Sequence, residues 1–155
     1  MAEALDRIYD ALLLDHIRAA RNYGLADSGP AALEIANPLC GDVLQLQVVA
    51  TQGRLAAVRF QCECCGIAMG NASLMTEAVQ GVELEQARKL AEQALAILTQ
   101  RLPLDPGGDA GGPWPLLQAV ARDLPGRRTC ASLGWQALLA ALDGQQACTA
   151  REIRA

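Results

Sequence analysis

Aromatic side chains are scarce in this sequence: phenylalanine, tryptophan and tyrosine together make up 3% of its 155 residues. Apolar residues nevertheless reach 52%, so a hydrophobic core must be built from leucine, alanine, valine and isoleucine. The length is that of one domain with a core of useful size. We therefore expect residues 1–155 to fold as a single domain.

The sequence also lacks a long apolar run and an excess of positive charge. No apolar stretch reaches the roughly 18 residues that a membrane-spanning helix needs. The first ten residues carry three acidic side chains, unlike a secretory signal. The net charge of −4 argues against a general binder of nucleic acid or anionic membranes. We expect a cytoplasmic protein with no nucleic-acid and no membrane partner.

Cysteine, by contrast, is present six times. Cytosolic thiols stay reduced, so these cysteines are expected to bind metal or carry chemistry rather than to pair in disulfides. Cys40 precedes a predicted strand, Cys65 precedes a predicted helix and Cys130 lies at the start of the last predicted helix. A helix N-terminus favours thiolate over thiol, and thiolate is the form that binds zinc or iron–sulfur clusters and attacks sulfur.

Alternation of apolar and polar residues predicts two strands, at 42–50 and 55–62, the second with Ala56, Val58 and Phe60 facing inward. The short glycine-containing turn between them predicts an antiparallel hairpin. A third, short edge strand is expected at 32–36.

Apolar residues at helical spacing predict five helices. They are expected at residues 4–21, 67–80, 84–101, 115–123 and 130–142. The polar segment 145–155 is expected to be a frayed tail. The pattern is that of an α+β fold, a small antiparallel sheet of about three strands with helices packed on one face.

The hairpin has a consequence for the cysteines, because antiparallel pairing brings the two ends of the hairpin together. Cys40 lies before its first strand and Cys65 after its second. Asp42 offers a harder oxygen ligand beside Cys40. Together with Cys130 these residues would form a Cys₃Asp set, which suits tetrahedral zinc and also a weakly held iron–sulfur cluster.

The remaining candidates have plainer interpretations. Cys62 shares the apolar face of its strand and is expected to pack in the core. Cys64 is an additional candidate ligand, and Cys148 lies in the polar tail with no expected role. Arg127 and the neighbouring Arg128 are either solvated charges or groups that lower the pKa of Cys130. His16, at the edge of an apolar helix face, is expected to be packed rather than to bind metal.

Three ordered motifs carry a resemblance to a known family. They are Asn-Pro-Leu-Cys-Gly-Asp at 37–42, the segment from Cys65 through Ile67 and Met69 to Thr76, and Cys-Ala-x-Leu-x-Trp at 130–135. In these motifs the chain resembles the NifU/IscU-type iron–sulfur cluster assembly proteins. The SufU branch is favoured, because IscU-type chains have a histidine at the position of Thr129. Residues 103–126 also resemble a SufU-type insertion, and Arg127 matches a SufU-type arginine.

The resemblance implies a SufU/IscU-like fold and a zinc site formed by Cys40, Asp42, Cys65 and Cys130. It further implies that a cysteine desulfurase donates persulfide sulfur to Cys130, which ligand exchange frees, with Arg127 supporting the thiolate. Downstream iron–sulfur acceptor proteins are then further partners. Two alternatives remain open: a scaffold that assembles and transfers a [2Fe–2S] cluster on Cys40, Cys65 and Cys130, and a purely structural zinc domain.

The chain departs from the family at two positions. Family members usually have glycines where this sequence has Cys62 and Cys64. The two added thiols can alter the choice of metal, or form a disulfide with Cys65 or with each other.

Overall fold

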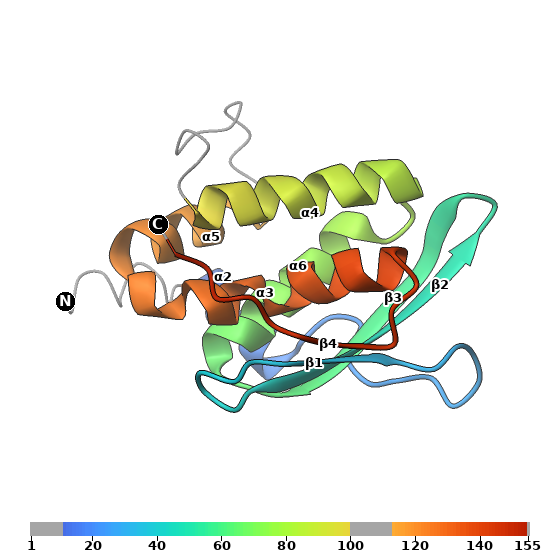
Figure 1. Cartoon of the computed structure of the whole chain (residues 1–155), viewed down its shortest axis with the longest axis horizontal. Helices are drawn as coiled ribbons and strands as arrows, with labels where there is room; N and C mark the ends of the chain where they lie inside the picture. Colours follow the sequence, from blue (N-terminus) through green and yellow to red (C-terminus); the bar gives the residue numbers. More distant parts are fainter. Residues whose placement is uncertain (1–10, 100–112, 155) are drawn as a thin grey trace.

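The computed structural model describes residues 11–99 and 113–154, in which helices cover one face of a small sheet (Figure 1). The elements, in chain order, are α2 (Ala11–Arg18), β1 (Leu33–Ala36), β2 (Val43–Thr51), β3 (Arg54–Glu63), α3 (Gly66–Val79), α4 (Leu84–Leu98), α5 (Trp114–Asp123), the 3₁₀ turn η1 (Pro125–Arg127), α6 (Arg128–Leu142) and β4 (Ala147–Thr149). The five predicted helices are present, but α2 ends at Arg18, so residues 19–21 of the helix expected at 4–21 are not helical. The beginning of the helix expected at 4–21, the end of that expected at 84–101 and residues 103–112 of the predicted insertion lie outside the described residues.

The sheet has the strand order β3-β2-β1-β4. β2 pairs with β3 in antiparallel register from Val43 opposite Glu63 to Thr51 opposite Arg54, which confirms the predicted hairpin. Its turn residues Gln52 and Gly53 have φ angles of 52° and 76°. Positive φ at both positions matches the right-handed twist of the flanking strands. The hairpin therefore has the tight turn that its sequence favours.

The C-terminal segment differs from the expectation of a frayed tail. β4 pairs with β1 in parallel, so the sheet is mixed and four-stranded, and β1 is an inner strand instead of an edge. Beyond β4, the N–H of Ile153 donates to Oγ1 of the buried Thr129 over 3.0 Å. The amide of Gln136 both donates to and accepts from the backbone of Arg151. Polar composition predicted a loose end, but the free edge of β1 and these side chains hold it.

A bulge in the hairpin makes the prediction for Ala56, which was expected to face inward, wrong. Val49 faces Ala57 and Ala50 faces Leu55, so the register shifts and Ala56 is the extra residue on β3. Ala56 is consequently exposed, and Leu55 points inward with Val58 and Phe60.

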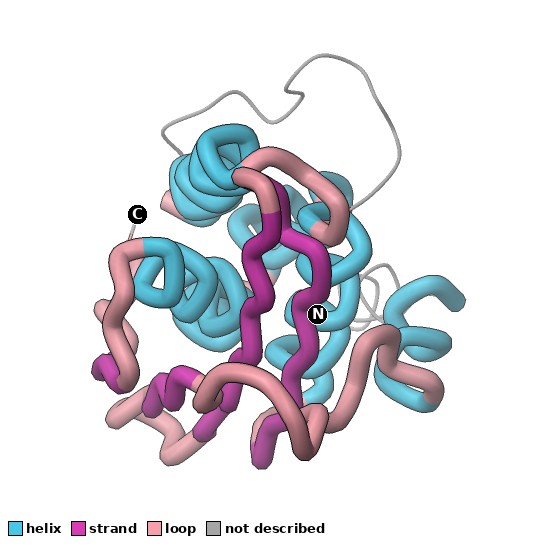
Figure 2. The backbone as a smooth tube through the Cα atoms, turned by 90° about the vertical axis from the view of Figure 1, so that its right-hand side faces the viewer, coloured by secondary structure: helices cyan, strands magenta, loops and turns pink. Residues whose placement is uncertain are grey.

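The helices form layers on one face of the sheet (Figures 1 and 2). α6 packs on β1 and β2, α3 packs on β3, and α4 covers α6 from the far side. A Cβ on Gly134 of α6 would lie 3.2 Å from the Cα of Ala72 in α3, so a glycine at this crossing lets the two helices approach closely. The predicted α+β architecture, with helices on one face, is confirmed.

Helix α2 and the residues that follow it form hydrogen bonds with α3 and β3. Residues 22–24 run along the outer edge of β3, where Gly24 N–H donates to the carbonyl of Phe60 over 2.7 Å. His16 of α2 is 1% exposed, as expected for a packed histidine, and its Nδ1 lies 2.6 Å from Oγ of Ser73 in α3. These contacts hold the helix whose first residue follows Cys65.

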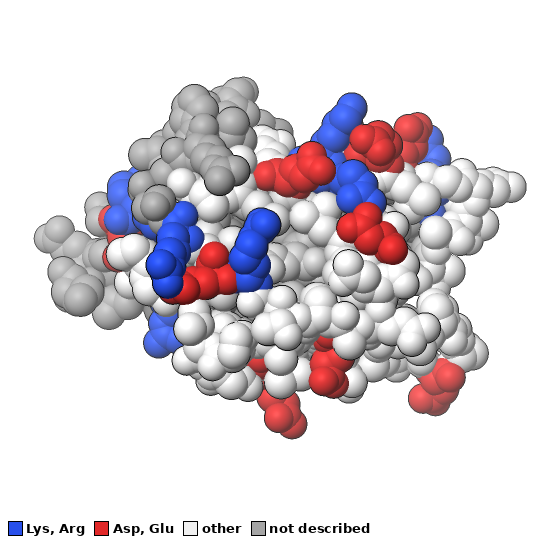
Figure 3. Space-filling view, in the orientation of Figure 1, with Lys and Arg blue, Asp and Glu red and all other residues white. Residues whose placement is uncertain are grey.

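Charged side chains of both signs are interspersed on the face shown in Figure 3. Within residues 11–99 and 113–154, no helix combines the length and the apolar character needed to span a bilayer.

Candidate metal centre

The loop between β1 and β2 is organised by Asn37, whose side chain is 1% exposed. Its Oδ1 accepts the N–H of Leu39 over 3.0 Å, and its carbonyl accepts the N–H of Gly41 over 2.8 Å. The N–H of Asn37 in turn donates to the carbonyl of Asp42 over 2.8 Å. Gly41 has a φ of 77°, a conformation that favours glycine. The tight loop therefore presents Cys40 and Asp42 from a defined backbone.

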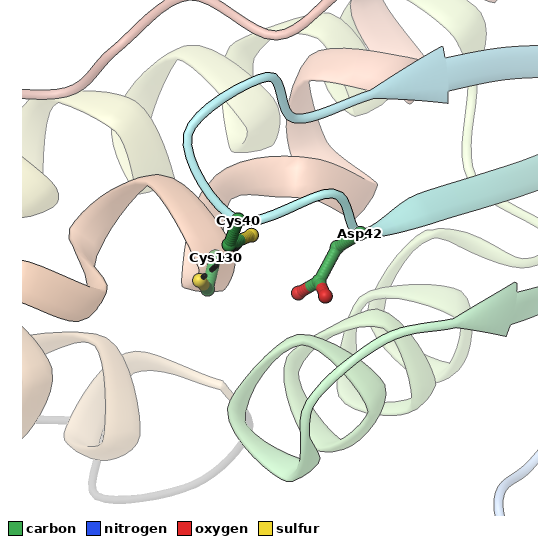
Figure 4. Close-up of side chains that lie close together, drawn as sticks. All are labelled: Cys40, Asp42 and Cys130. Atoms are coloured by element: carbon green, nitrogen blue, oxygen red, sulfur yellow. Dashed lines mark hydrogen bonds between the residues drawn. The ribbon is translucent and has the colours of Figure 1, made fainter.

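Cys130 meets this loop from the first turn of α6. Its Sγ lies 3.9 Å from Sγ of Cys40, and its side chain is 4% exposed. A carboxylate oxygen of Asp42 and the two sulfurs all lie within 4.8 Å of one another. Figure 4 shows the two cysteines side by side, with the Asp42 carboxylate nearby. Residues from a loop and a distant helix thus converge on one point.

Cys65 lies directly before α3 and adjoins this group. Its N–H donates to Oδ2 of Asp42 over 3.3 Å. Interaction with the Cys130 thiol, together with the backbone amides of Ala68 and Ile67, lowers the pKa of Cys65 to about 6 against the opposing effect of burial. The same interaction, with burial and the nearby Cys40, raises the pKa of Cys130.

The donor set fits zinc. Three thiolates and a carboxylate are ligands that zinc accepts in tetrahedral sites. Two sulfurs bound at about 2.3 Å to one tetrahedral ion are about 3.8 Å apart, close to the 3.9 Å between Cys40 and Cys130. Of the four predicted ligands, Cys40, Asp42 and Cys130 form the tightest group, and Cys65 lies beside it. Their roles as ligands stay predictions.

Cys64 is not available as an additional ligand, because it forms a disulfide with Cys62. The two residues flank Glu63 at the end of β3, with Cα atoms 5.5 Å apart, a normal spacing for a bridge. Cys62 packs against the core as expected, with its Sγ 3.9 Å from Sδ of Met69. The expectation that all six cysteines stay reduced is therefore wrong for this pair. The other four are free.

The two arginines before Cys130 differ in their surroundings. Arg128 is buried and its guanidinium donates to the carbonyl of Ala121, so it is directed toward α5. Arg127 is exposed at the residue before α6, and its support of the Cys130 thiolate stays a prediction. The shift in the pKa of Cys130 is upward, opposite to the lowering considered for these arginines.

Asn37 is the residue whose role the sequence did not reveal. Besides shaping the loop, its Nδ2 lies 4.0 Å from Sγ of Cys130, so its amide is directed at the thiol. An asparagine that begins a turn is a known sequence signal, and Asn-Pro-Leu-Cys-Gly carries it. The contact with Cys130, however, depends on the packing of α6.

Fold and site together define an α+β protein with thiols and a carboxylate gathered at one end of a mixed sheet. The family model described as NifU-like N terminal domain matches residues 8–110. The zinc-dependent sulfurtransferase SufU of Bacillus subtilis (strain 168) is 31% identical over 134 residues, which cover 86% of this chain and 88% of that protein. The chain therefore belongs to the NifU-like family of iron–sulfur cluster assembly scaffolds, which confirms the resemblance seen in its motifs.

Two further relatives agree with this assignment. The iron–sulfur cluster assembly scaffold protein IscU of Streptococcus pyogenes serotype M1 is 32% identical over 138 residues, 89% of this chain and 84% of that protein. A crystal structure from Fervidobacterium islandicum AW-1, described as a scaffold for the SUF system, has a TM-score of 0.75 at 22% identity. The match covers 87% of this chain and 96% of that chain, and at this identity it is evidence for the fold only.

Proposed function

We propose that this protein is a cytoplasmic, zinc-binding sulfur acceptor that takes persulfide sulfur from a cysteine desulfurase for iron–sulfur cluster assembly. The convergence of Cys40, Asp42 and Cys130, with Cys65 adjoining, carries the proposal. The similarity to the zinc-dependent sulfurtransferase of Bacillus subtilis supports zinc as the metal.

Zinc would be held by Cys40, Asp42, Cys65 and Cys130. When bound, the ion supplies a fixed positive charge that keeps its cysteine ligands deprotonated near neutral pH. Asn37 holds the loop that carries two of these residues and directs its amide toward Cys130. The chain's own contribution is thus a set of thiols held in place before the sulfur donor arrives.

Cys130 is the proposed acceptor. Its thiolate attacks the outer sulfur of a cysteine persulfide on the desulfurase. A sulfur–sulfur bond forms to Cys130 as the donor's sulfur–sulfur bond breaks, and the donor cysteine leaves as a thiolate. No external electrons are needed, because the sulfane sulfur only changes carrier.

Access to Cys130 requires the Asn37–Asp42 loop to move. Cys130 is 4% exposed, whereas Cys40, which lies next to it, is exposed. Leu39 is 63% exposed at the tip of the loop, so the tip has little packing to lose when it swings away. We infer that binding of the desulfurase opens this loop.

The second candidate function is a scaffold that assembles a [2Fe–2S] cluster and passes it to acceptor proteins. The similarity to IscU of Streptococcus pyogenes favours it. Cys40, Cys65 and Cys130 would hold that cluster. Thr129, the residue before Cys130, accepts the N–H of Ile153 with its hydroxyl, so it offers no further ligand for a cluster. We therefore rank the zinc-binding sulfur acceptor above the scaffold. The exposure of Cys40 disfavours a purely structural zinc domain.

Metal analysis followed by an activity assay tests the proposal. After anaerobic purification we expect about one zinc per chain and no visible absorbance, whereas a brown protein would support the scaffold. The zinc-loaded protein should increase the turnover of a cysteine desulfurase supplied with cysteine and a reductant. Cys130→Ala should abolish the increase and Cys148→Ala, the matched control, should retain it. Equal stimulation by the two variants would show that Cys130 is not the acceptor.

A further inference from the structure

We propose that Cys62 and Cys64 form a second, redox-active site that reduces a persulfide on Cys130 and releases its sulfur as hydrogen sulfide. The proposal rests on the sulfur-acceptor function above. The pair would deliver sulfur at the oxidation level of sulfide, the form in which clusters contain it. The Cys62–Cys64 disulfide would then be the oxidised state of the site.

The position of the pair beside the metal centre is the first argument. Cys64 is the residue before Cys65, so their Cα atoms are about 3.8 Å apart. Cys65 interacts through its thiol with Cys130. Cys62 faces Leu44 across the hairpin, at the end of β2 that follows Asp42. The disulfide therefore lies at the same end of the sheet as the proposed acceptor.

Access from outside is the second argument. Cys62 and Cys64 are both half-exposed. Cys62 also lines an open cavity of about 440 Å³, together with Tyr23, Gln45 and Glu63. The acceptor Cys130 is by contrast buried. An external dithiol can thus reach Cys62 and Cys64 while Cys130 stays covered.

The short loop that the disulfide closes is the third argument. Cys62 and Cys64 are two positions apart in the chain. A crosslink stabilises a fold mainly by restricting the unfolded chain, and the effect is smallest for short loops. A bridge of this span has little value as a structural staple. Reversible chemistry is the role that its position favours.

The reaction balances in two steps. The Cys64 thiolate attacks the outer sulfur of the Cys130 persulfide, forming a persulfide on Cys64 and releasing the Cys130 thiolate. The Cys62 thiolate then attacks Sγ of Cys64, the Cys62–Cys64 disulfide forms, and hydrosulfide leaves. The two cysteines lose two electrons and the sulfane sulfur gains them. An external dithiol reductant, by the same exchange, returns the pair to its thiol form.

The persulfide itself covers part of the distance between Cys130 and Cys64. A persulfide extends the reach of Cys130 by about 2 Å, the length of a sulfur–sulfur bond. The loop movement that admits the sulfur donor also uncovers the side of Cys130 that faces Cys40. Transfer to Cys64 then also requires the residues around Cys65 to move, so that Cys64 turns toward Cys130.

A single-turnover experiment tests the proposal. The zinc-loaded, fully reduced protein is freed of reductant and mixed with a cysteine desulfurase that already carries a persulfide, without added cysteine or reductant. Released sulfide is measured, and peptide mass spectrometry locates persulfides and disulfides. In the unmodified protein we expect sulfide and the Cys62–Cys64 disulfide to appear in equal amounts.

Matched serine variants separate the two steps. Cys64→Ser should lower sulfide release at least about tenfold and leave the persulfide on Cys130. Cys62→Ser should also lower release but hold the sulfur on Cys64, and Cys148→Ser should behave as the unmodified protein. The proposal is overturned if Cys64→Ser releases sulfide at the normal rate, or if the unmodified protein keeps both its persulfide and two reduced cysteines. Absence of a Cys130 persulfide even in Cys64→Ser would instead refute the acceptor function, and this proposal with it.

Discussion

The sulfur atoms of Cys40 and Cys130 lie 3.9 Å apart although 90 positions separate them in the chain. Cys40 comes from the loop between β1 and β2, and Cys130 from the first turn of α6. Their distance is therefore set by the packing of α6 on the sheet. Because two thiolates on one tetrahedral zinc ion have nearly this separation, the pair can share an ion without a change of backbone.

Loss of either sulfur should lower the zinc content. We expect Cys40→Ser and Cys130→Ser each to retain less than about half of the zinc of the unmodified protein after dialysis against a chelator, because a hydroxyl is a poor substitute for a thiolate. Elemental analysis measures this, with Cys148→Ser as the matched control. Full zinc occupancy in both site variants would mean that the ion binds elsewhere.

Asn37 should stabilise both the loop and the site. Asn37→Ala removes the acceptor of the Leu39 N–H and a buried amide directed at Cys130. We expect the free energy of unfolding in urea to fall by about 1–3 kcal/mol. Asn37→Ser keeps a short acceptor for the turn and should lose less stability. If alanine and serine behave alike, the turn hydrogen bond contributes nothing measurable.

Gly70 should be intolerant of a side chain. A Cβ there would lie 2.1 Å from Cδ1 of Leu13, which is 1% exposed and packs α2 on α3. Overpacking of this kind costs about 1–3 kcal/mol, against a gain of about 1 kcal/mol from alanine in a helix. We expect Gly70→Ala to lower the free energy of unfolding. A double-mutant cycle with Leu13→Ala should show that the two changes together cost less than their sum, and strict additivity would contradict the contact.

His16 should make stability fall below neutral pH. Burial is the main cause that lowers its pKa from 6.5, so the unfolded chain binds a proton at a higher pH than the folded protein does. The contribution is complete above about pH 6.5 and is lost as the pH falls from there through the folded pKa. Urea unfolding at about pH 7.5 and about pH 5.5 should show a larger loss for the unmodified protein than for His16→Gln.

The opposite result, a smaller loss of stability in the unmodified protein, would point to Glu77. Nε2 of His16 lies 3.3 Å from a carboxylate oxygen of Glu77. If the unmodified protein lost less stability than His16→Gln on acidification, that carboxylate would outweigh burial and hold the pKa of His16 above 6.5.

The hairpin and the helices could be predicted because their signals are local. Leu44 and Leu46 alternate with glutamines, and Gly53 marks the turn, so the strands and their pairing follow from neighbouring residues. The bulge at Ala56 and the strand β4 could not be predicted in this way. A bulge depends on the register against a partner strand, and β4 forms because β1, more than a hundred residues earlier in the chain, leaves an edge to pair with.

By itself, the sequence determined the family, the antiparallel hairpin and the residue types able to carry the chemistry, because motifs, alternation and turns are written in adjacent positions. The tertiary structure decided how these residues meet: Cys64 is bonded to Cys62, Cys65 has an acidic thiol beside Cys130, and Asn37 supports both loop and sulfur. These outcomes depend on distances between elements far apart in the chain. Such distances are set by the packing of α3 and α6 against the sheet, to which every core side chain contributes.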